Sequence, residues 1–242
     1  MRDVVAASCI VLAAAACAVP ERAPVTTGFV AKTLASNGVE HRYAVYVPPG
    51  YTDDREWPLI VFLHGMGECG TDGSKHLDVG LGPALRAQPD RWPFVVVLPQ
   101  KPDRESQWAE HDAMVMAMLA AAEREYRIDR SRRLLTGLSQ GGAGTWALGA
   151  AHPGVWAAIA PVCGYGRPAD VAPKLTAMPI RAFHGLDDRV VPPQQSKDLV
   201  AAVNAAGGSA ALTEYEGVAH NSWDAAYRES PLAEWLQQQV RR

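Results

Sequence analysis

The chain has 242 residues, of which 48% are apolar and 20% are charged, and its formal net charge is −3 at pH 7. This length and apolar content suit one globular domain with a full core. No run of lysine or arginine stands out, so the charge pattern gives no support to a protein that binds nucleic acid or another polyanion.

The N-terminal stretch predicts export. Residues 4–16 are an apolar run that is too short to span a bilayer and has the length of the hydrophobic region of a signal peptide. We therefore predict a signal peptide over residues 1–18, followed by a tether and first-strand region over residues 19–40. The alanines before Cys17 resemble a bacterial lipobox, so the alternative is a lipoprotein anchored at Cys17. The protein would be periplasmic, at the cell surface or secreted, with that anchor as its only contact with a membrane.

The rest of the chain, residues 41–242, predicts a single α/β domain. Short apolar runs that favour strands lie at residues 42–47, 59–63, 94–98, 133–136, 157–162, 180–183 and 211–215. Helix-like segments lie between them, near residues 75–88, 111–126, 142–151, 193–206 and 222–239. Strands that alternate with helices of this length indicate a mainly parallel central sheet with helices on both faces.

The cysteines leave one question open. Cys9 and Cys17 lie in the leader, and Cys69 and Cys163 lie in the body of the chain. An oxidising compartment permits a disulfide between Cys69 and Cys163, but the sequence does not determine whether the two thiols meet. No cysteine and histidine cluster has the spacing of a zinc site, so we predict no bound metal.

A glycine-rich turn surrounds Ser139. The sequence Gly137-Leu138-Ser139-Gln140-Gly141 follows one expected strand and precedes an expected helix. A sharp turn from strand to helix forces its central residue into a strained conformation and needs minimal side chains around it. The serine would also lie at a helix N-terminus, where backbone N–H groups favour developing negative charge. We interpret Ser139 as a catalytic nucleophile rather than as part of an ordinary turn.

A serine nucleophile needs an oriented base, and three histidines follow Ser139 in the chain. His152 lies at the end of the helix that follows the nucleophile, and His184 ends an expected strand. His220 lies in the loop after the last expected strand, where a mobile base could reach the serine. We therefore predict that His220 is the base.

Two adjacent aspartates, Asp187 and Asp188, follow the strand expected at residues 180–183. A buried carboxylate here would accept a hydrogen bond from the ring N–H of His220, fix its tautomer and stabilise the imidazolium. The residues alone leave both aspartates open as the acid, and the other would form the turn.

Two backbone N–H groups are expected to form an oxyanion hole. One belongs to Gln140, the residue after the nucleophile, and the other to the loop His64-Gly65-Met66-Gly67 after an early strand. We assign the second donor to Met66, with Gly67 as the alternative. We expect His64 to organise this loop rather than to act as a second base.

With these motifs in place, residues from about 42 to 220 resemble the α/β-hydrolase esterases. This group includes phospholipase/carboxylesterases, acyl-protein thioesterase-like enzymes and feruloyl or acetylxylan esterases, and the chain looks most similar to a bacterial branch of predicted peptidases or polyhydroxybutyrate-depolymerase-like proteins. The blocks that carry the resemblance are residues 46–51, 63–68, 99–100 with Trp108, 137–146, 161–164 and 184–192.

The resemblance implies an α/β-hydrolase fold and refines the site. The family pattern His-Gly-x-x-Asp-x-x-Val-Pro selects Asp188 over Asp187. The resemblance also implies that Glu68 shapes the active-site loop and that Trp108 lies beside the acyl pocket, so both are candidate substrate-binding residues. Cys69 departs from the family, in which many relatives carry arginine or another polar residue.

The segment between Cys163 and Ile180 is too short to form a sizeable lid, so we expect an open, shallow site. We predict a serine carboxylic-ester hydrolase that needs no cofactor and acts on small or polymer-borne esters with feruloyl, acetyl or short acyl groups. A serine peptidase with the same triad is the alternative, although no anchor for a peptide terminus is evident. A non-catalytic binding protein on the same fold is a third hypothesis, and such proteins usually lose a member of the triad.

Overall fold

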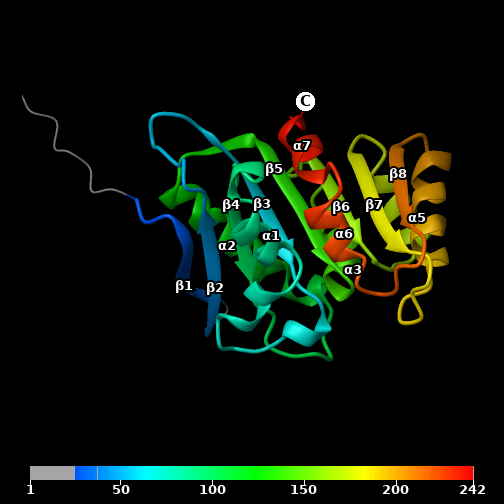
Figure 1. Ribbon diagram of the computed structural model, residues 1–242, viewed down its shortest axis with the longest axis horizontal. Helices are drawn as coiled ribbons and strands as arrows, with labels where there is room; N and C mark the ends of the chain where they lie inside the picture. The colour runs from blue at the N-terminus through cyan, green and yellow to red at the C-terminus, as the bar shows by residue number, and fades with distance from the viewer. Residues whose placement is uncertain (1–24, 37, 242) are drawn as a thin grey trace, which may run out of the picture.

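Eight strands form one sheet across the residues that the computed structural model describes, 25–36 and 38–241 (Figure 1). The predicted signal peptide lies outside these residues. The spatial order of the strands is β1-β2-β4-β3-β5-β6-β7-β8. Their bounds are β1 Gly28–Ser36, β2 Val39–Val47, β3 Trp57–Leu63, β4 Val95–Pro99, β5 Ile128–Leu138, β6 Ala158–Val162, β7 Pro179–Gly185 and β8 Ser209–Tyr215.

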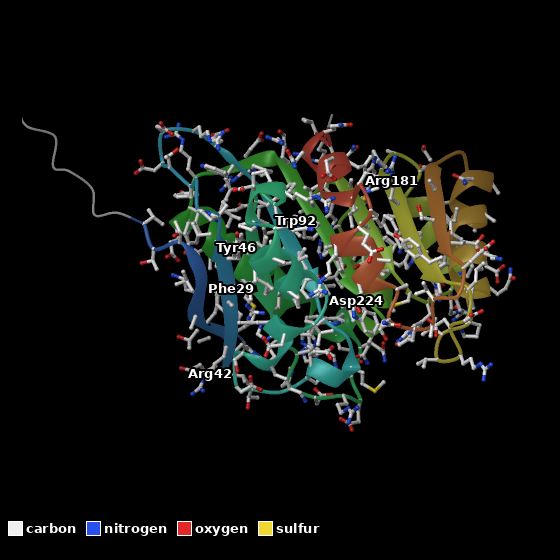
Figure 2. All side chains as sticks on the ribbon, in the orientation of Figure 1. Phe29, Arg42, Tyr46, Trp92, Arg181 and Asp224 are labelled. Carbon is white, nitrogen blue, oxygen red and sulfur yellow. The ribbon has the colours of Figure 1, made fainter. Side chains whose placement is uncertain are left out.

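The sheet is antiparallel only toward its β1 edge. The β1–β2 and β2–β4 pairings are antiparallel, and the pairings from β4 through β3, β5, β6 and β7 to β8 are parallel. The predicted mainly parallel sheet is therefore confirmed. β1 lies within residues 19–40, where a tether and a first strand were expected. It packs on its neighbour through the rings of Phe29 and Tyr46, whose centroids are 5.2 Å apart (Figure 2).

Helices cover both faces of this sheet. They are α1 Leu81–Ala87, α2 Asp112–Glu125, α3 Gln140–Ala151, α4 Pro168–Val171, α5 Gln194–Ala205, α6 Trp223–Arg228 and α7 Leu232–Gln237. One apolar cluster joins the sheet to α2, α3 and α5, and a second joins it to α1, α6 and α7, which lie toward the viewer in Figure 1. Side chains of β3 alternate between the clusters, with Leu59 and Val61 in the first and Ile60 and Phe62 in the second. This two-residue period explains why the strand reads as one continuous apolar run.

Two predicted helices are shorter than expected. The segment 75–88 contains the 3₁₀ helix η2 Lys75–Asp78 and then α1, separated near Gly80, which has a φ of 67°. The segment 222–239 is divided into α6 and α7 just before Pro231, because proline cannot continue a helix from the preceding turn.

Cys69 and Cys163 are both free thiols, and Cys163 is buried. The disulfide that the sequence permitted is therefore not formed. Within the described part of the chain, no helix has the length and apolar character that crossing a membrane requires.

Arg91 forms hydrogen bonds that connect the 3₁₀ helix η3 Pro89–Arg91 to the C-terminal helices α6 and α7. Its guanidinium donates to both carboxylate oxygens of Glu234 at 2.9 and 3.0 Å. It also donates to the backbone oxygens of Arg228 and Ser230 at 2.7 and 2.8 Å. The two side chains of the ion pair are 27% and 48% exposed, so solvent weakens the pair, and the bonds to carbonyl groups carry part of the stabilisation.

We expect Arg91→Ala to lower the free energy of unfolding by about 1–2 kcal/mol, because several charge-assisted hydrogen bonds are lost together. Arg167→Ala is the control, since its pair with Asp170 is longer, at 3.6 Å, and mostly exposed; we expect a change below about 0.5 kcal/mol. Urea titration of both variants measures the difference. Equal losses would contradict a special role for Arg91.

Candidate active site

The residues singled out by the sequence analysis gather at the carboxyl edge of the parallel strands. Ser139 follows β5, Asp188 follows β7 and His220 follows β8. The 3₁₀ helix η1 Met66–Glu68 follows β3. Because parallel strands end at the same edge of a sheet, these four loops converge although they are far apart in the sequence.

Ser139 lies in a strained turn between β5 and α3. Its φ is 55° and its ψ is −118°, and among the described residues only Cys163 shares a positive φ without being glycine. The N–H of Ser139 donates to the carbonyl of Val162 at 2.9 Å, and its own carbonyl accepts from Ala143 at 3.0 Å. These bonds hold a conformation that costs on the order of 1–3 kcal/mol.

Close backbone contacts explain the glycines around Ser139. A Cβ atom on Gly141 would lie 2.0 Å from the carbonyl oxygen of Leu63, and one on Gly137 would lie 2.6 Å from the same oxygen. A Cβ on Gly142 would lie 2.4 Å from the carbonyl oxygen of Val162. The turn can therefore fit between its neighbouring strands only with glycine at these positions.

The structure brings Ser139, His220 and Asp188 together. The Nε2 atom of His220 is 2.9 Å from Oγ of Ser139, and its Nδ1 atom is 2.7 Å from Oδ2 of Asp188. The His220 side chain is 20% exposed, whereas the Asp188 side chain is wholly buried. The edge of Trp223 contacts the imidazole ring, with the ring centroids 5.4 Å apart.

The neighbouring candidates lie elsewhere. Asp187 is exposed, and its N–H donates to the carbonyl of Val218. His152 pairs with Asp112 at 2.8 Å. His184 is fully buried. Its Nε2 atom hydrogen-bonds the carbonyl of Val191 at 3.0 Å and lies 3.2 Å from Oδ2 of Asp188, so the ring packs against the carboxylate.

Hydrogen bonds keep the Asp188 carboxylate ionised. Burial raises the pKa of this group, but the bonds from His220 and from the N–H groups of Val191 and Val190 outweigh that effect, so the pKa lies below its ordinary value. The two backbone bonds measure 2.9 and 2.8 Å and meet at Oδ1, which leaves Oδ2 for the histidines. Asp188 therefore accepts the Nδ1–H of His220, so Nε2 is free to accept a proton from Ser139.

Met66 and Gln140 each occupy the first position of a helix, in η1 and α3 respectively. Backbone N–H groups at that position have no acceptor within the helix, so they are available to a ligand. The loop before η1 is fixed by His64, whose Nδ1–H donates to the carbonyl of Gly65 at 2.6 Å and whose Nε2 accepts from the N–H of Lys101 at 2.9 Å.

His64 is a neutral support for this loop. Burial lowers the pKa of His64 to about 3, so the ring carries no charge at neutral pH and both of its nitrogens are occupied by backbone partners. Trp108 has no exposed surface, and its Nε1–H donates to the carbonyl of His64 at 3.0 Å. The structure thus places Trp108 beneath the loop rather than on the surface around Ser139.

Glu68 lies beside the nucleophile. A Cβ atom built on Gly65 would be 3.0 Å from Oε2 of Glu68 and 3.5 Å from Cβ of Ser139. Burial raises the pKa of the Glu68 carboxyl, while hydrogen bonds from backbone groups at Gly65 and Glu68 itself oppose that effect. The carboxyl group is therefore half-buried next to the reactive serine.

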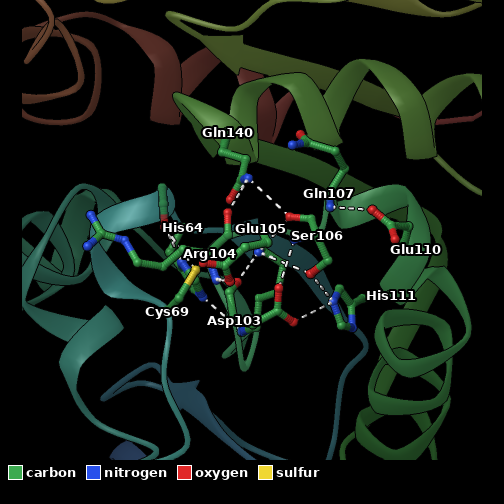
Figure 3. Close-up of polar contacts among 12 residues, drawn as sticks. His64, Cys69, Asp103, Arg104, Glu105, Ser106, Gln107, Glu110, His111 and Gln140 are labelled. Carbon is green, nitrogen blue, oxygen red and sulfur yellow. Dashed lines mark hydrogen bonds and ion pairs between the residues drawn. The ribbon is translucent and has the colours of Figure 1, made fainter.

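A loop after β4, which was not predicted from the sequence, contacts the residue next to Ser139 (Figure 3). The side-chain amide of Gln140 donates to the carbonyls of Arg104 and Ser106 at 3.3 and 3.1 Å. Lys101 is fully buried and donates to the same Ser106 carbonyl at 2.8 Å. The one signal in the sequence is the polar Gln140 next to Ser139, which does not reveal its partners.

We expect Gly141→Ala to lower the free energy of unfolding by at least about 2 kcal/mol, because the new methyl group would overlap the Leu63 carbonyl. Gly154→Ala is the matched control, since a Cβ there meets nothing within 4 Å, and a change below about 0.5 kcal/mol is expected. Urea titrations of the two variants test this packing; similar stabilities would show that the turn can relax.

Comparisons with known proteins agree with this geometry. Residues 82–229 match the phospholipase/carboxylesterase family. A probable feruloyl esterase C from Aspergillus terreus is 25% identical in an alignment that is 226 positions long and covers 81% of each chain. A thermostable esterase of known structure is 34% identical with a TM-score of 0.79 over 88% of this chain, which spans 63% of that protein.

A more distant structure shares only the fold. The acylaminoacyl peptidase of Pyrococcus horikoshii has a TM-score of 0.68 at 15% identity, and the match covers 89% of this chain but 42% of the peptidase. The resemblance drawn from the motifs and the predicted α/β-hydrolase fold are both confirmed. The chain belongs to the phospholipase/carboxylesterase family of α/β hydrolases.

Proposed function

We propose that this chain hydrolyses carboxylic esters through an acyl-enzyme on Ser139, with His220 as the base and Asp188 as the acid. The observation that carries the proposal is the hydrogen-bonded line from the serine hydroxyl through the imidazole to the carboxylate, with links of 2.9 and 2.7 Å. Membership of a carboxylesterase family supports the same chemistry.

In the first half of the reaction, Ser139 attacks the ester carbonyl while Nε2 of His220 takes the hydroxyl proton. Asp188 stays ionised, accepts the Nδ1–H bond throughout and stabilises the imidazolium that forms. The imidazolium then gives the same proton to the leaving alcohol, and the acyl group remains on Ser139. In the second half, His220 takes a proton from water, the hydroxide equivalent attacks the acyl-enzyme, and the acid is released with the serine restored.

The negative oxygen of each tetrahedral intermediate would be held by the N–H groups of Met66 and Gln140. Both begin helices, where uncompensated N–H groups favour an anion. One such donor contributes about 10²–10³-fold to the rate in serine hydrolases. Trp108 would act as a positioning residue, because it contacts the backbone of His64 rather than the reacting atoms. Glu68 would face the bound substrate beside Ser139.

The proposed substrates are small or polymer-borne esters with feruloyl, acetyl or short acyl groups. The likeness to a probable feruloyl esterase supports an aromatic acyl group. A peptidase is less well supported, because the peptidase compared above is more than twice as long as the region that matches this chain. We also propose that residues 1–18 direct export of the domain 41–242, with a lipid anchor at Cys17 as the alternative to secretion.

Ser139→Ala should lower kcat by about 10⁴-fold or more and abolish labelling by a fluorophosphonate probe.

Asp188→Asn should lower kcat by about 10⁴-fold, because the imidazole loses its ionised partner and the required tautomer. Asp187→Asn is the control, since this carboxylate is exposed and lies outside the hydrogen-bonded line; its activity should stay roughly that of the unmodified protein. A larger loss with Asp187→Asn than with Asp188→Asn would reverse the assignment of the acid.

A matched panel of p-nitrophenyl esters and aminoacyl p-nitroanilides tests the reaction class. We expect turnover of acetyl, butyryl and feruloyl esters, with kcat/KM for the amides lower by at least about 10²-fold, because nothing in the described site anchors a peptide terminus. The Ser139→Ala protein corrects for background hydrolysis. Faster turnover of the amides than of the esters would favour the peptidase.

A further inference from the structure

The thiol of Cys163 lies beside Asp188 and His220 and takes no part in the proposed mechanism. The Sγ atom of Cys163, a carboxylate oxygen of Asp188 and a ring nitrogen of His220 all lie within 4.8 Å of one another. Cys163 directly follows β6 and has a φ of 40°, and its N–H donates to the carbonyl of Phe183 at 2.8 Å. The left-handed backbone at this residue is thus fixed by the neighbouring strand, with the thiol beside the histidine and the aspartate.

A second buried group faces the same thiol. Ser222 has no exposed surface, and its hydroxyl lies against the sulfur of Cys163. Within the described residues this hydroxyl has no hydrogen-bond partner that meets ordinary limits. Buried hydroxyl groups are nearly always satisfied, and sulfur is a weak hydrogen-bond partner, so the Ser222 oxygen retains the capacity to bind another polar species beside Cys163.

The donor set matches that of a thiophilic divalent cation. Thiolate, imidazole and carboxylate are the ligands that Zn²⁺ takes in proteins, with bonds of about 2.0–2.3 Å. Tetrahedral ligands at those distances are separated by about 3.3–3.8 Å. The three ligand atoms already lie within 4.8 Å of one another, so the sulfur needs only a small approach. The Nδ1 atom of His220 and the Oδ2 atom of Asp188 are 2.7 Å apart and would separate by about 0.6 Å to admit the ion. The Ser222 hydroxyl or a water molecule can complete the coordination.

We propose that Cys163, Asp188 and His220 form a site for a divalent cation such as Zn²⁺, and that its occupancy switches off ester hydrolysis. The switch rests on the proposed function, whereas the site itself does not. The ion would enter beside His220, the one ligand with an exposed side chain, and it would replace the hydrogen bond between His220 and Asp188.

The proton shifts that accompany cation binding explain why the bound ion would stop His220 from acting as a base. Cys163 loses its thiol proton to solvent when the sulfur binds the cation. The Nδ1 atom of His220 donates its lone pair to the cation, so the ring proton moves to Nε2. An Nε2–H group donates a hydrogen bond to Ser139 and cannot take its proton. One proton is released in total, and no atom is oxidised or reduced.

Cobalt(II) tests the site without any measurement of activity. The full-length chain is prepared with Cys9, Cys17 and Cys69 replaced by serine, so that Cys163 is its one thiol. We expect Co²⁺ to produce a thiolate-to-cobalt band in the ultraviolet and the visible bands of tetrahedral cobalt, and Zn²⁺ to abolish both. Absence of the thiolate band in this protein would overturn the site, whether or not the chain proves to be an esterase.

Further substitutions in that background identify the ligands. Adding Cys163→Ser should remove the thiolate band, and adding His220→Asn should weaken cobalt binding at least tenfold while the thiol remains. The second variant keeps the test decisive if the first fails to fold. Cobalt binding that is unchanged by His220→Asn would overturn the proposed ligand set.

Zinc inhibition tests the switch. Hydrolysis of p-nitrophenyl acetate by the unmodified chain and by Cys69→Ser should be inhibited at similar Zn²⁺ concentrations and restored by a chelator. Cys163→Ser should need at least tenfold more Zn²⁺ for half-inhibition, with each protein compared with its own zinc-free rate. Equal zinc sensitivity of the two variants, or zinc binding without loss of rate, would overturn the switch.

Discussion

The backbone contacts around Ser139 fix the turn on which the other groups of the site converge. The N–H of Ser139 is bound to the end of β6, and the Gly141 backbone touches the carbonyl of Leu63 at the end of β3. The turn is therefore packed tightly between the ends of β3 and β6, the two strands that flank β5. Because main-chain atoms make these contacts, no side-chain rearrangement can relieve them, and the serine is held in its strained conformation before a substrate arrives.

The same strands place the partners of Ser139 at one edge of the sheet. His220 is 81 residues from the serine and Asp188 is 32 residues from the histidine, so only the parallel arrangement brings them within hydrogen-bond distance. Asp188 and His220 are held in place to different degrees. Asp188 is buried and held by two backbone N–H groups, whereas His220 lies on a loop and its side chain is 20% exposed. A rigid carboxylate and a more accessible imidazole fit the proposed roles, in which only His220 would exchange protons with substrate and water.

The sequence predicted those features of the fold and the site that depend on local residue patterns. It predicted less well the features that depend on tertiary packing. Apolar runs predicted the parallel strands, and the glycines around Ser139 predicted the tight turn, because both signals are local. The choice between Asp187 and Asp188 needed the family pattern, since adjacent residues share the same loop and differ only in direction. The buried position of Trp108 and its bond to the carbonyl of His64 were not predictable from the sequence, because a tryptophan gives the same local signal whether it faces a ligand or packs under a loop.

Asp188 and Cys163 are both buried, but the carboxylate is ionised at neutral pH and the thiol is neutral. Hydrogen bonds hold the pKa of Asp188 below its ordinary value, so its ionised form stabilises the fold at neutral pH, and that contribution is lost as the pH falls through the folded-state pKa. Burial raises the pKa of Cys163 to about 12, so the thiol stays neutral and adds no second negative charge beside the carboxylate. A neutral thiol would leave the proposed proton transfer from Ser139 to His220 undisturbed, whereas an ionised thiol would attract cations to the same position. Under the proposals above, this contrast would let one cluster of atoms hold a base or, after loss of a single proton, a set of metal ligands.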